Sequence, residues 1–335
     1  MSGPLTTQDG MKAIMKKYGL MVGLLWMTVS AGWAEPHPGA EQFIESVVNE
    51  HALDPDLVRS VVSQAEYQQS IIDAMTRPAE AKPWHEYRGI FLNDTRIAGG
   101  AEFWRANERL LTQISDTYGI PIELVVAIVG VETNYGMNTG SFRVIDALAT
   151  LGFYYEPRAE FFARELGHFM ALAEEEALPL TDIRGSYAGA MGLGQFIPSS
   201  YRAYAVDFDG SGHRDLWRSL PDALGSVANY LAEHRWIPGQ PIALATDAVP
   251  EGVDMADFQL KPNATLGALQ AQGIRFDDQG LPPDTPATLI ELEGSDGPEY
   301  WVGLNNFYVI TRYNRSPLYA MAVTQLADEI AQRAE

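Results

Sequence analysis

Between residues 36 and 237, apolar positions recur three and four residues apart, which is the spacing of one face of an α-helix. The pattern is clearest in the runs FIESVVNEHAL, LVRSVVSQAEY and FWRANERLLTQISDTYG, the last of which is followed by a helix-stop signal at Gly119. These runs predict amphipathic helices that pack around a common core.

The pattern changes near Ile237, where Pro238, Gly239 and Pro241 interrupt the helical spacing. The runs that follow, ALATDAV, ATLIELEG and YWVGLNNFYVITRY, favour β-strands separated by turns. The final run, SPLYAMAVTQLADEIAQRAE, again has the spacing of an amphipathic helix and can return to the helical body. We therefore predict a mainly α (α+β) fold with a small inserted β domain.

Residues 1–34 have the pattern of an export signal. Lys12, Lys16 and Lys17 precede the apolar run YGLMVGLLWMTVSAG, and Ala34 offers a small-residue cleavage position. The run is shorter than the about 20 residues of a comfortable membrane span, and no cysteine follows it to carry a lipid. We expect cleavage after Ala34 and a soluble periplasmic protein. An uncleaved N-terminal anchor is the alternative.

Composition excludes several classes of function. The chain has 335 residues, no cysteine, and 44 acidic against 23 basic residues, which gives a formal net charge of −21. Without cysteine, disulfide scaffolds, zinc-thiolate sites and thiol nucleophiles are excluded. Nucleic-acid binding is not expected, because phosphate neutralisation needs clustered lysine and arginine. The length and the 46% hydrophobic content predict a folded protein of about two domains.

The segment PIELVVAIVGVETNYG predicts a buried helix with one carboxyl group at its end. Between residues 122 and 131 the only polar side chain is Glu123, so this helix is apolar nearly all round. A spacing of four places Leu124, Ile128 and Glu132 on one stripe. Glu132 must therefore find a partner, open onto a cleft, or stay protonated through a raised pKa.

The protonated state is the one that a general acid needs. Two alternatives remain open for Glu132: an ion pair with Arg143 or Arg158, or simple exposure to water at the helix end.

The segment GSYAGAMGLGQFIPSSY is rich in glycine, which allows the backbone to lie close to a bulky ligand. Ser186 and Gln195 could donate directional hydrogen bonds to hydroxyl or acetamido groups. Glycines that only allow close helix packing are the alternative.

The segment DFDGSGHRDLW matches several positions of an EF-hand calcium loop. The matching residues are Asp207, Asp209 and Ser211, the His213 carbonyl, and Asp215 at the ninth place. The twelfth place, where a bidentate Glu is expected, holds Arg218, which cannot bind a cation. Asp222 could supply the missing carboxylate if the loop is longer than usual.

Two alternatives to this calcium site remain open. Ser219 and Asp222 also form the ends of a capping box that would begin the helix DALGSVANYLAEHRW. The loop could also be an acidic surface turn that binds no metal.

Taken in order, GVETNYG, DALATLGFYYEPRAEFF, GSYAGAMGLGQFIPSSY, the EF-hand-like loop and GSVANYL are similar to motifs of the lytic murein transglycosylase B family. The likeness runs from about Trp84 through Met321. It implies a lysozyme-like helical core with a small β domain, a periplasmic location, and Glu132 as the catalytic acid and base. It also implies that the glycan cleft is lined by Tyr87, Arg158, Ser186, Gln195, Tyr230, Tyr313, Asn314 and Tyr319. Taken singly, each tyrosine is more often a packing residue, and Arg158 a solvated one.

The resemblance implies non-hydrolytic cleavage of the MurNAc-GlcNAc β-1,4 bond of peptidoglycan to 1,6-anhydromuramoyl products. One alternative is a hydrolytic muramidase, whose second carboxylate could be Asp146 or Glu160, although Asp146 could equally cap a helix or pair with Arg143. The other is a non-catalytic wall-binding protein stabilised by calcium. We expect structural Ca²⁺, no organic cofactor, no nucleic acid, no stable membrane anchor, and a monomer.

We predict five segments along the chain. They are a signal peptide (1–34), an N-terminal helical segment (35–115), a lysozyme-like catalytic core with the EF-hand-like loop (116–236), a small β-containing domain (237–305), and a C-terminal strand and helix that return to the core (306–335).

Overall fold

Helices make up most of residues 37–77 and 81–334, which are the residues that the computed structural model describes. The predicted export signal lies outside these residues. The α-helices are α1 (Ala40–His51), α2 (Pro55–Gln64), α3 (Gln69–Met75), α4 (Trp84–Phe91), α5 (Asp94–Tyr118), α6 (Ile122–Thr133), α7 (Val144–Tyr154), α8 (Ala159–Glu175), α9 (Pro198–Tyr204), α10 (Leu220–Glu233), α11 (Leu266–Ala271), α12 (Asn305–Tyr313) and α13 (Pro317–Ala334). Two short 3₁₀ helices are η2 (Glu156–Arg158) and η3 (Met255–Asp257).

The strands form one five-stranded sheet and one two-stranded pair. The strands are β1 (Phe142–Arg143), β2 (Arg184–Gly185), β3 (Ala243–Ala248), β4 (Ala264–Thr265), β5 (Arg275–Phe276), β6 (Pro286–Gly294) and β7 (Gly297–Gly303). The larger sheet has the order β4-β6-β7-β3-β5 and its neighbouring strands are antiparallel, while β1 pairs with β2.

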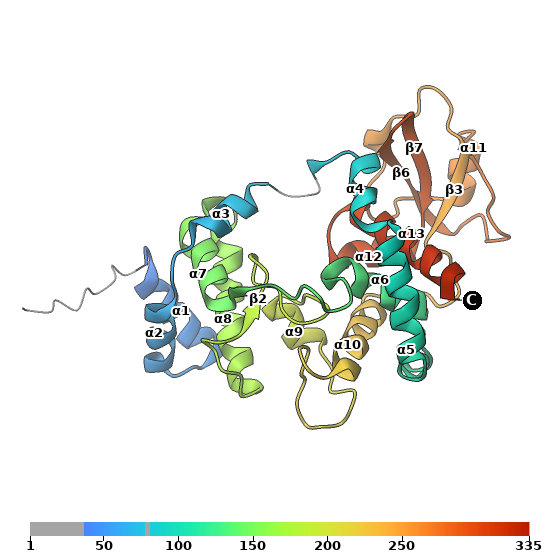
Figure 1. Ribbon diagram of the computed structural model, residues 1–335. Helices are drawn as coiled ribbons and strands as arrows, with labels where there is room; N and C mark the ends of the chain where they lie inside the picture. Colours follow the sequence, from blue (N-terminus) through green and yellow to red (C-terminus); the bar gives the residue numbers. More distant parts are fainter. Residues whose placement is uncertain (1–36, 78–80, 335) are drawn as a thin grey trace, which may run out of the picture. The chain divides into compact units, whose positions relative to one another are not determined.

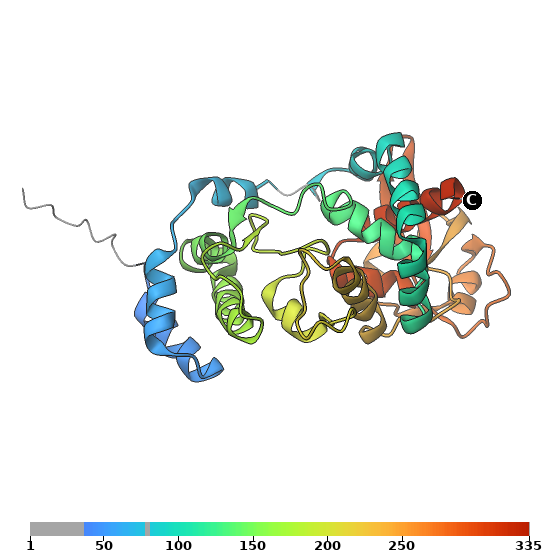
Figure 2. The same ribbon diagram turned by 60° about the horizontal axis from the view of Figure 1, so that its bottom comes forward.

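Helix α13 joins the end of the chain to its first half. It packs against α4, α5 and α6, so segments that are far apart in the sequence lie side by side (Figure 1). Helices α1, α2 and α3 pack instead against α7 and α8 (Figure 2). The C-terminal helix thus completes the environment of α6.

Helix α6 is the buried centre of this arrangement. Every residue from Leu124 to Gly130 is buried, as the uniformly apolar sequence predicts. Among the described residues, no single helix is both long and apolar enough to cross a membrane, although the bent pair α5 and α6 passes by length and composition.

Two hydrophobic clusters underlie the helical and β regions. The larger cluster includes residues from α1 through α13. The smaller one lies between Leu244 and Leu304 and is formed by side chains of the five-stranded sheet and α11. The predicted mainly α fold with a small sheet region is confirmed. The strand predicted over YWVGLNNFYVITRY is wrong in its second half, because only YWVG belongs to β7 and Asn305–Tyr313 form helix α12. Its buried positions Asn306, Phe307, Val309 and Ile310 recur three and four residues apart, which is the spacing of a helix.

Candidate active site

Glu132 stands at the last turn of α6, where the backbone leaves the helix abruptly. Asn134, Tyr135 and Gly136 all have positive φ, with values of 51°, 60° and 90°. Consecutive left-handed residues are rare outside glycine, and they turn the chain away directly after the helix. Glu132 is half-buried at this turn, although Thr133 beside it is buried.

Tyr135 folds back onto α6 and holds this turn in place. Its hydroxyl donates to the Arg96 carbonyl at 2.8 Å, and the Arg96 guanidinium donates to the Gly130 carbonyl. A Cβ on Gly130 would lie 2.7 Å from the Tyr135 hydroxyl, so this position requires glycine. Gly130, two residues before Glu132, and Tyr135, three residues after it, therefore fix the backbone around Glu132.

Glu132 is hydrogen-bonded to a tyrosine of the C-terminal helix. The Tyr319 hydroxyl donates to Glu132 Oε1 at 2.7 Å. Burial and the nearby Glu132 charge raise the pKa of Tyr319 well above its ordinary value. Tyr319 therefore keeps its proton at any physiological pH and is a permanent donor to the carboxyl group.

Further aromatic residues surround this pair. The rings of Tyr313 and Tyr319 are stacked with centroids 6.4 Å apart, and Tyr230 lies 4.9 Å from Tyr313. Phe196 lies within 5.8 Å of Tyr230 and Tyr313. The Tyr230 hydroxyl donates to the Arg312 carbonyl. The structure thus gathers three of the predicted cleft tyrosines beside Glu132.

The glycine-rich loop, residues 185–197, is tied to this group from two sides. Thr133 of α6 donates through Oγ1 to the Leu193 carbonyl at 3.0 Å. From α12, the Tyr313 hydroxyl donates to the Gly194 carbonyl at 2.6 Å. Thr133 was not among the residues predicted for the site. The only signal for it in the sequence is its position directly after Glu132.

The two polar side chains predicted on this loop both contact the backbone. Gln195 has a φ of +51° and donates through Nε2 to the carbonyls of Gly192 and Thr139, at 2.9 and 3.2 Å. The Ser186 hydroxyl accepts hydrogen bonds from the Ala188 and Ala190 amides, at 3.2 and 3.0 Å. The side chains of Gln195 and Ser186 therefore maintain the shape of the glycine-rich loop.

The remaining predicted cleft residues have different surroundings. Tyr87 of α4 is only 2% exposed and lies close enough to Tyr319 to contribute to its raised pKa. Asn314 follows α12 and is half-buried. Arg158 is exposed, and its guanidinium lies 4.5 Å from the Phe161 ring. Among the described contacts, Arg158 does not join the group around Glu132.

Asp146 and Glu160, considered as a second carboxylate, have structural partners. Asp146 is 5% exposed and forms a two-point ion pair with Arg143, at 2.7 and 2.8 Å. The exposed Glu160 pairs with Arg164 at 2.6 Å. The pairing of Asp146 with Arg143 was one of the alternatives drawn from sequence, and it leaves Arg143 bound to a different carboxylate from Glu132.

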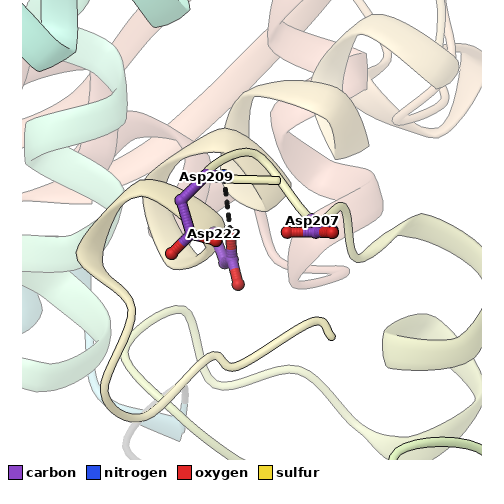
Figure 3. Close-up of side chains that lie close together, drawn as sticks. All are labelled: Asp207, Asp209 and Asp222. Atoms are coloured by element: carbon purple, nitrogen blue, oxygen red, sulfur yellow. Dashed lines mark hydrogen bonds between the residues drawn. The ribbon is translucent and has the colours of Figure 1, made fainter. Parts of the chain in front are cut away.

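The acidic loop, residues 207–222, brings three carboxyl groups together (Figure 3). One oxygen from each of Asp207, Asp209 and Asp222 lies within 4.8 Å of the others. The Asp222 side chain is fully buried, and its carboxylate accepts the Phe208 and Asp209 amides at 2.8 and 3.2 Å and the Asp215 amide at 2.9 Å.

The N-cap of helix α10 and the cluster of three carboxyl groups are present in the same loop. Ser219 is the N-cap of α10, and its hydroxyl accepts the Asp222 amide at 3.2 Å. The same hydroxyl donates to Asp209 at 2.6 Å. Ser211 and His213 are exposed on the loop, and Ser211 donates to the His213 carbonyl at 3.2 Å.

Comparison with known proteins places this geometry in a family. Residues 36–328 match the Transglycosylase SLT domain. The chain is 41% identical over 305 residues to membrane-bound lytic murein transglycosylase B of Escherichia coli (strain K12), covering 88% of this chain and 83% of that protein. The chain therefore belongs to the family of SLT-domain transglycosylases, of the lytic murein transglycosylase B type.

Two solved structures show the same fold. The catenated lytic transglycosylase SltB1 from Pseudomonas aeruginosa is 46% identical, with a TM-score of 0.82, and the match covers 89% of this chain and 98% of that one. The Escherichia coli lytic transglycosylase Slt35 in complex with calcium is 39% identical, with a TM-score of 0.78, over 89% of this chain and 94% of that one.

Proposed function

We propose that this protein is a lytic transglycosylase that cleaves the MurNAc-GlcNAc β-1,4 bond of peptidoglycan without water, with Glu132 as its catalytic acid and base. The observation that carries this proposal is the half-buried Glu132 carboxyl group, held by Tyr319 at 2.7 Å in a chain of this family. Family membership disfavours both the hydrolytic muramidase and the non-catalytic wall-binding protein.

In the proposed reaction, the Glu132 carboxyl group first donates its proton to the oxygen that links the two sugars. The substrate's own N-acetyl group stabilises the resulting sugar cation. The Glu132 carboxylate then accepts the proton of the muramoyl C6 hydroxyl, which attacks C1 and closes the 1,6-anhydro ring. One residue serves both steps, so no second carboxylate is required.

The surrounding residues orient this carboxyl group and the glycan. Tyr319 donates to one carboxylate oxygen throughout the cycle, because its raised pKa keeps it protonated. We also assign Tyr87, Tyr230, Tyr313, Asn314, Ser186 and Gln195 to the glycan cleft, because they match cleft positions of the family. Arg158 is an exposed cation suited to a carboxylate of the substrate further along the cleft.

The decisive experiment is Glu132→Gln, which removes the proton that is transferred and keeps the shape of the side chain. Turnover of murein sacculi should fall by several orders of magnitude while sacculus binding and the melting temperature persist. Glu123→Gln, at the other end of the same helix, is the matched control and should retain activity.

Mass spectrometry of the muropeptides released by the wild type separates the proposed reaction from hydrolysis. Products with 1,6-anhydromuramoyl ends, one water lighter than reducing ends, are expected. Reducing ends would overturn the transglycosylase assignment, and near-normal release by Glu132→Gln would overturn the role of Glu132.

We also infer a structural calcium ion bound by Asp207, Asp209, Ser211, the His213 carbonyl and Asp222. The close approach of three carboxyl groups supports it, since neighbouring carboxylates repel one another and a cation between them removes that repulsion. The calcium complex of the Slt35 relative adds support. When bound, the ion would neutralise this cluster and stabilise the start of α10.

Asp207→Asn tests the calcium site without touching the buried Asp222. Millimolar calcium should raise the melting temperature of the wild type by preferential binding to the folded state, and the variant should lose most of that increment. Asp254→Asn, at an exposed turn outside the cluster, should keep it. An equal calcium response in all three proteins would contradict the assignment.

Export to the periplasm is the last part of the proposal, and it rests on the Lys-flanked apolar run before Ala34. Fractionation should find a processed chain that begins near Glu35 in the soluble periplasm. A full-length chain in the membrane pellet would identify residues 1–34 as an anchor.

A further inference from the structure

A cavity of about 470 Å³ lies between residues 259–261 and the C-terminal half of α12. Polar groups that donate hydrogen bonds dominate its lining. They belong to Gln259, Lys261, Tyr308, Arg312 and Arg315, and no acidic residue is among the lining residues. A cavity of this composition favours an anion.

Three exposed cations line this cavity in a chain with a net charge of −21. Elsewhere, Arg143, Arg164 and Arg202 pair with carboxylates. In the part of the chain that the structure describes, the side chains of Lys261, Arg312 and Arg315 form neither an ion pair nor a hydrogen bond. The cavity therefore has three cations and no acidic residue among its lining residues.

The walls of the cavity are held by the fold. On one side, the Thr288 hydroxyl of β6 donates to the Gln259 carbonyl at 2.8 Å. Asn263 accepts the Gln259 amide at 3.3 Å and donates to the Asp257 carbonyl at 2.8 Å. On the other side, Thr311 is buried in α12 and donates to the Tyr308 carbonyl at 2.6 Å. The donors are therefore mounted on ordered backbone.

The cavity adjoins the residues around Glu132. The Arg312 carbonyl accepts the Tyr230 hydroxyl, and the next residue, Tyr313, bonds to the glycine-rich loop. The Arg312 guanidinium is also close enough to Tyr230 and His234 to act on them electrostatically. One short stretch of chain, residues 312–319, thus links the cavity to the Tyr319 hydroxyl that holds Glu132.

We propose that this cavity binds a carboxylate of the peptide that murein carries on its muramoyl residues, through Lys261, Arg312 and Arg315. This inference rests on the proposed function, because that function places a peptide-bearing glycan beside Glu132. Guanidinium groups bind carboxylates through paired hydrogen bonds. The site would make the enzyme prefer glycan strands whose peptides are present.

The test compares two substrates and two variants. The substrates are glycan strands that bear peptides and the same strands after an amidase has removed the peptides. The double variant Lys261→Gln/Arg315→Gln should lose about tenfold in kcat/KM on the first substrate and nothing on the second. Arg275→Gln, an exposed cation of β5 outside the cavity, is the control and should behave as the wild type on both.

Calorimetric titration with the free synthetic stem peptide provides a second readout that needs no catalysis. The wild type should bind the peptide, and the double variant should bind it about tenfold more weakly. The same peptide with its carboxyl groups amidated should not bind. If the wild type cleaved neither substrate, the proposed function would fail. This titration would still show whether the cavity binds the peptide.

Three results would overturn the inference. They are an equal loss on both substrates, equal peptide affinity in the wild type and the double variant, and displacement of the peptide by inorganic phosphate at the same concentration as the peptide itself. The last result would indicate an unselective anion site. Circular dichroism of the double variant checks that its fold is intact.

Discussion

The glycine-rich loop and the acidic loop are both short, irregular segments, yet opposite kinds of contact hold them. The glycine-rich loop is fixed by Thr133 and Tyr313, which lie on helices distant in sequence. The acidic loop is held mainly by its own carboxylates, since Asp207 accepts the Ser211 and Gly212 amides and Asp222 accepts three others. It also meets the glycine-rich loop, because the Leu193 amide donates to the Leu216 carbonyl at 2.9 Å.

This difference separates the two roles. A loop that bonds to α6 and α12 is positioned relative to Glu132, so its displacement changes the site. The acidic loop, at the start of α10, bonds to the glycine-rich loop at Leu193 but to no residue beside the Glu132 carboxyl group among the described contacts, so we expect it to contribute mainly to stability. The substitutions at Asp222, Tyr319 and Tyr313 below each perturb one side of this comparison, and Glu165 lies outside both loops.

The largest expected effect is that of Asp222→Asn in the acidic loop. The amide has one acceptor oxygen in place of two, so at least one of three buried backbone amides loses its partner. We expect a loss of about 3 kcal/mol in the free energy of unfolding, measured by urea denaturation. Asp215→Asn, half-buried with only local bonds, should cost about 1 kcal/mol. Turnover well below the melting temperature should be preserved. A loss of turnover would show that the acidic loop acts on the catalytic residues.

The second largest effect is expected for Tyr319→Phe, which acts on the residues around Glu132. It removes the 2.7 Å hydrogen bond to Glu132 without altering the ring. A hydrogen bond to a charged group is worth about 1.5–3 kcal/mol, so kcat should fall by about 10- to 100-fold. Steady-state muropeptide release measures it, with Tyr300→Phe in β7 as control. An unchanged kcat would show that Glu132 is oriented by other groups.

Tyr313→Phe should have a smaller effect that sharpens the comparison. It leaves the Gly194 carbonyl without its 2.6 Å donor and loosens the glycine-rich loop. We expect about 1 kcal/mol less stability and a drop in kcat/KM smaller than that of Tyr319→Phe. Thermal denaturation and initial rates together check this. A loss of stability with no change in rate would mean that this loop, like the acidic one, only supports the fold.

The smallest effect concerns pH and Glu165, which lies outside both loops. Burial raises the pKa of Glu165 above its ordinary value of 4.5, against the opposing hydrogen bonds from Ser199. The folded state therefore binds this proton more tightly than the unfolded state, and the stability it contributes is lost as pH rises through the raised pKa.

Glu165→Gln should accordingly flatten the decline in unfolding free energy above pH 4.5 relative to the wild type. Glu160→Gln, exposed on the same helix, is the control. Parallel pH profiles for the wild type and Glu165→Gln would contradict the expected direction.

Much of the fold could be predicted because its signals are local. The apolar run of α6, the runs ALATDAV and ATLIELEG as β3 and β6, and the final amphipathic helix each appear in the expected place. The second half of YWVGLNNFYVITRY does not, because it forms α12 and not a strand. The N-cap at Ser219 was likewise predictable, since the amide that it accepts lies three residues away, at Asp222. The other half of the predicted capping box is not formed, because the Ser219 amide donates to the Asp215 carbonyl.

The contacts of the site were harder to foresee because they join distant residues. No periodicity indicates that Thr133 bonds to Leu193, or that Tyr319 meets Glu132 across 187 positions. Sequence pattern also leaves open whether Asp146 pairs with Arg143, since an ion pair and a helix cap favour the same residue types. The individual cleft residues were expected only through resemblance to a family.

The bond between Tyr319 and Glu132 has a consequence for how the protein is made. A polypeptide emerging from the ribosome or from an export channel exposes Glu132 long before the residues of α13. Until that helix docks on α5 and α6, the carboxyl group lacks its donor, and the apolar face of α6 lacks a cover. We therefore expect a nascent or C-terminally truncated chain to cleave the wall at least as poorly as the Tyr319→Phe variant, so that full activity follows only the docking of α13.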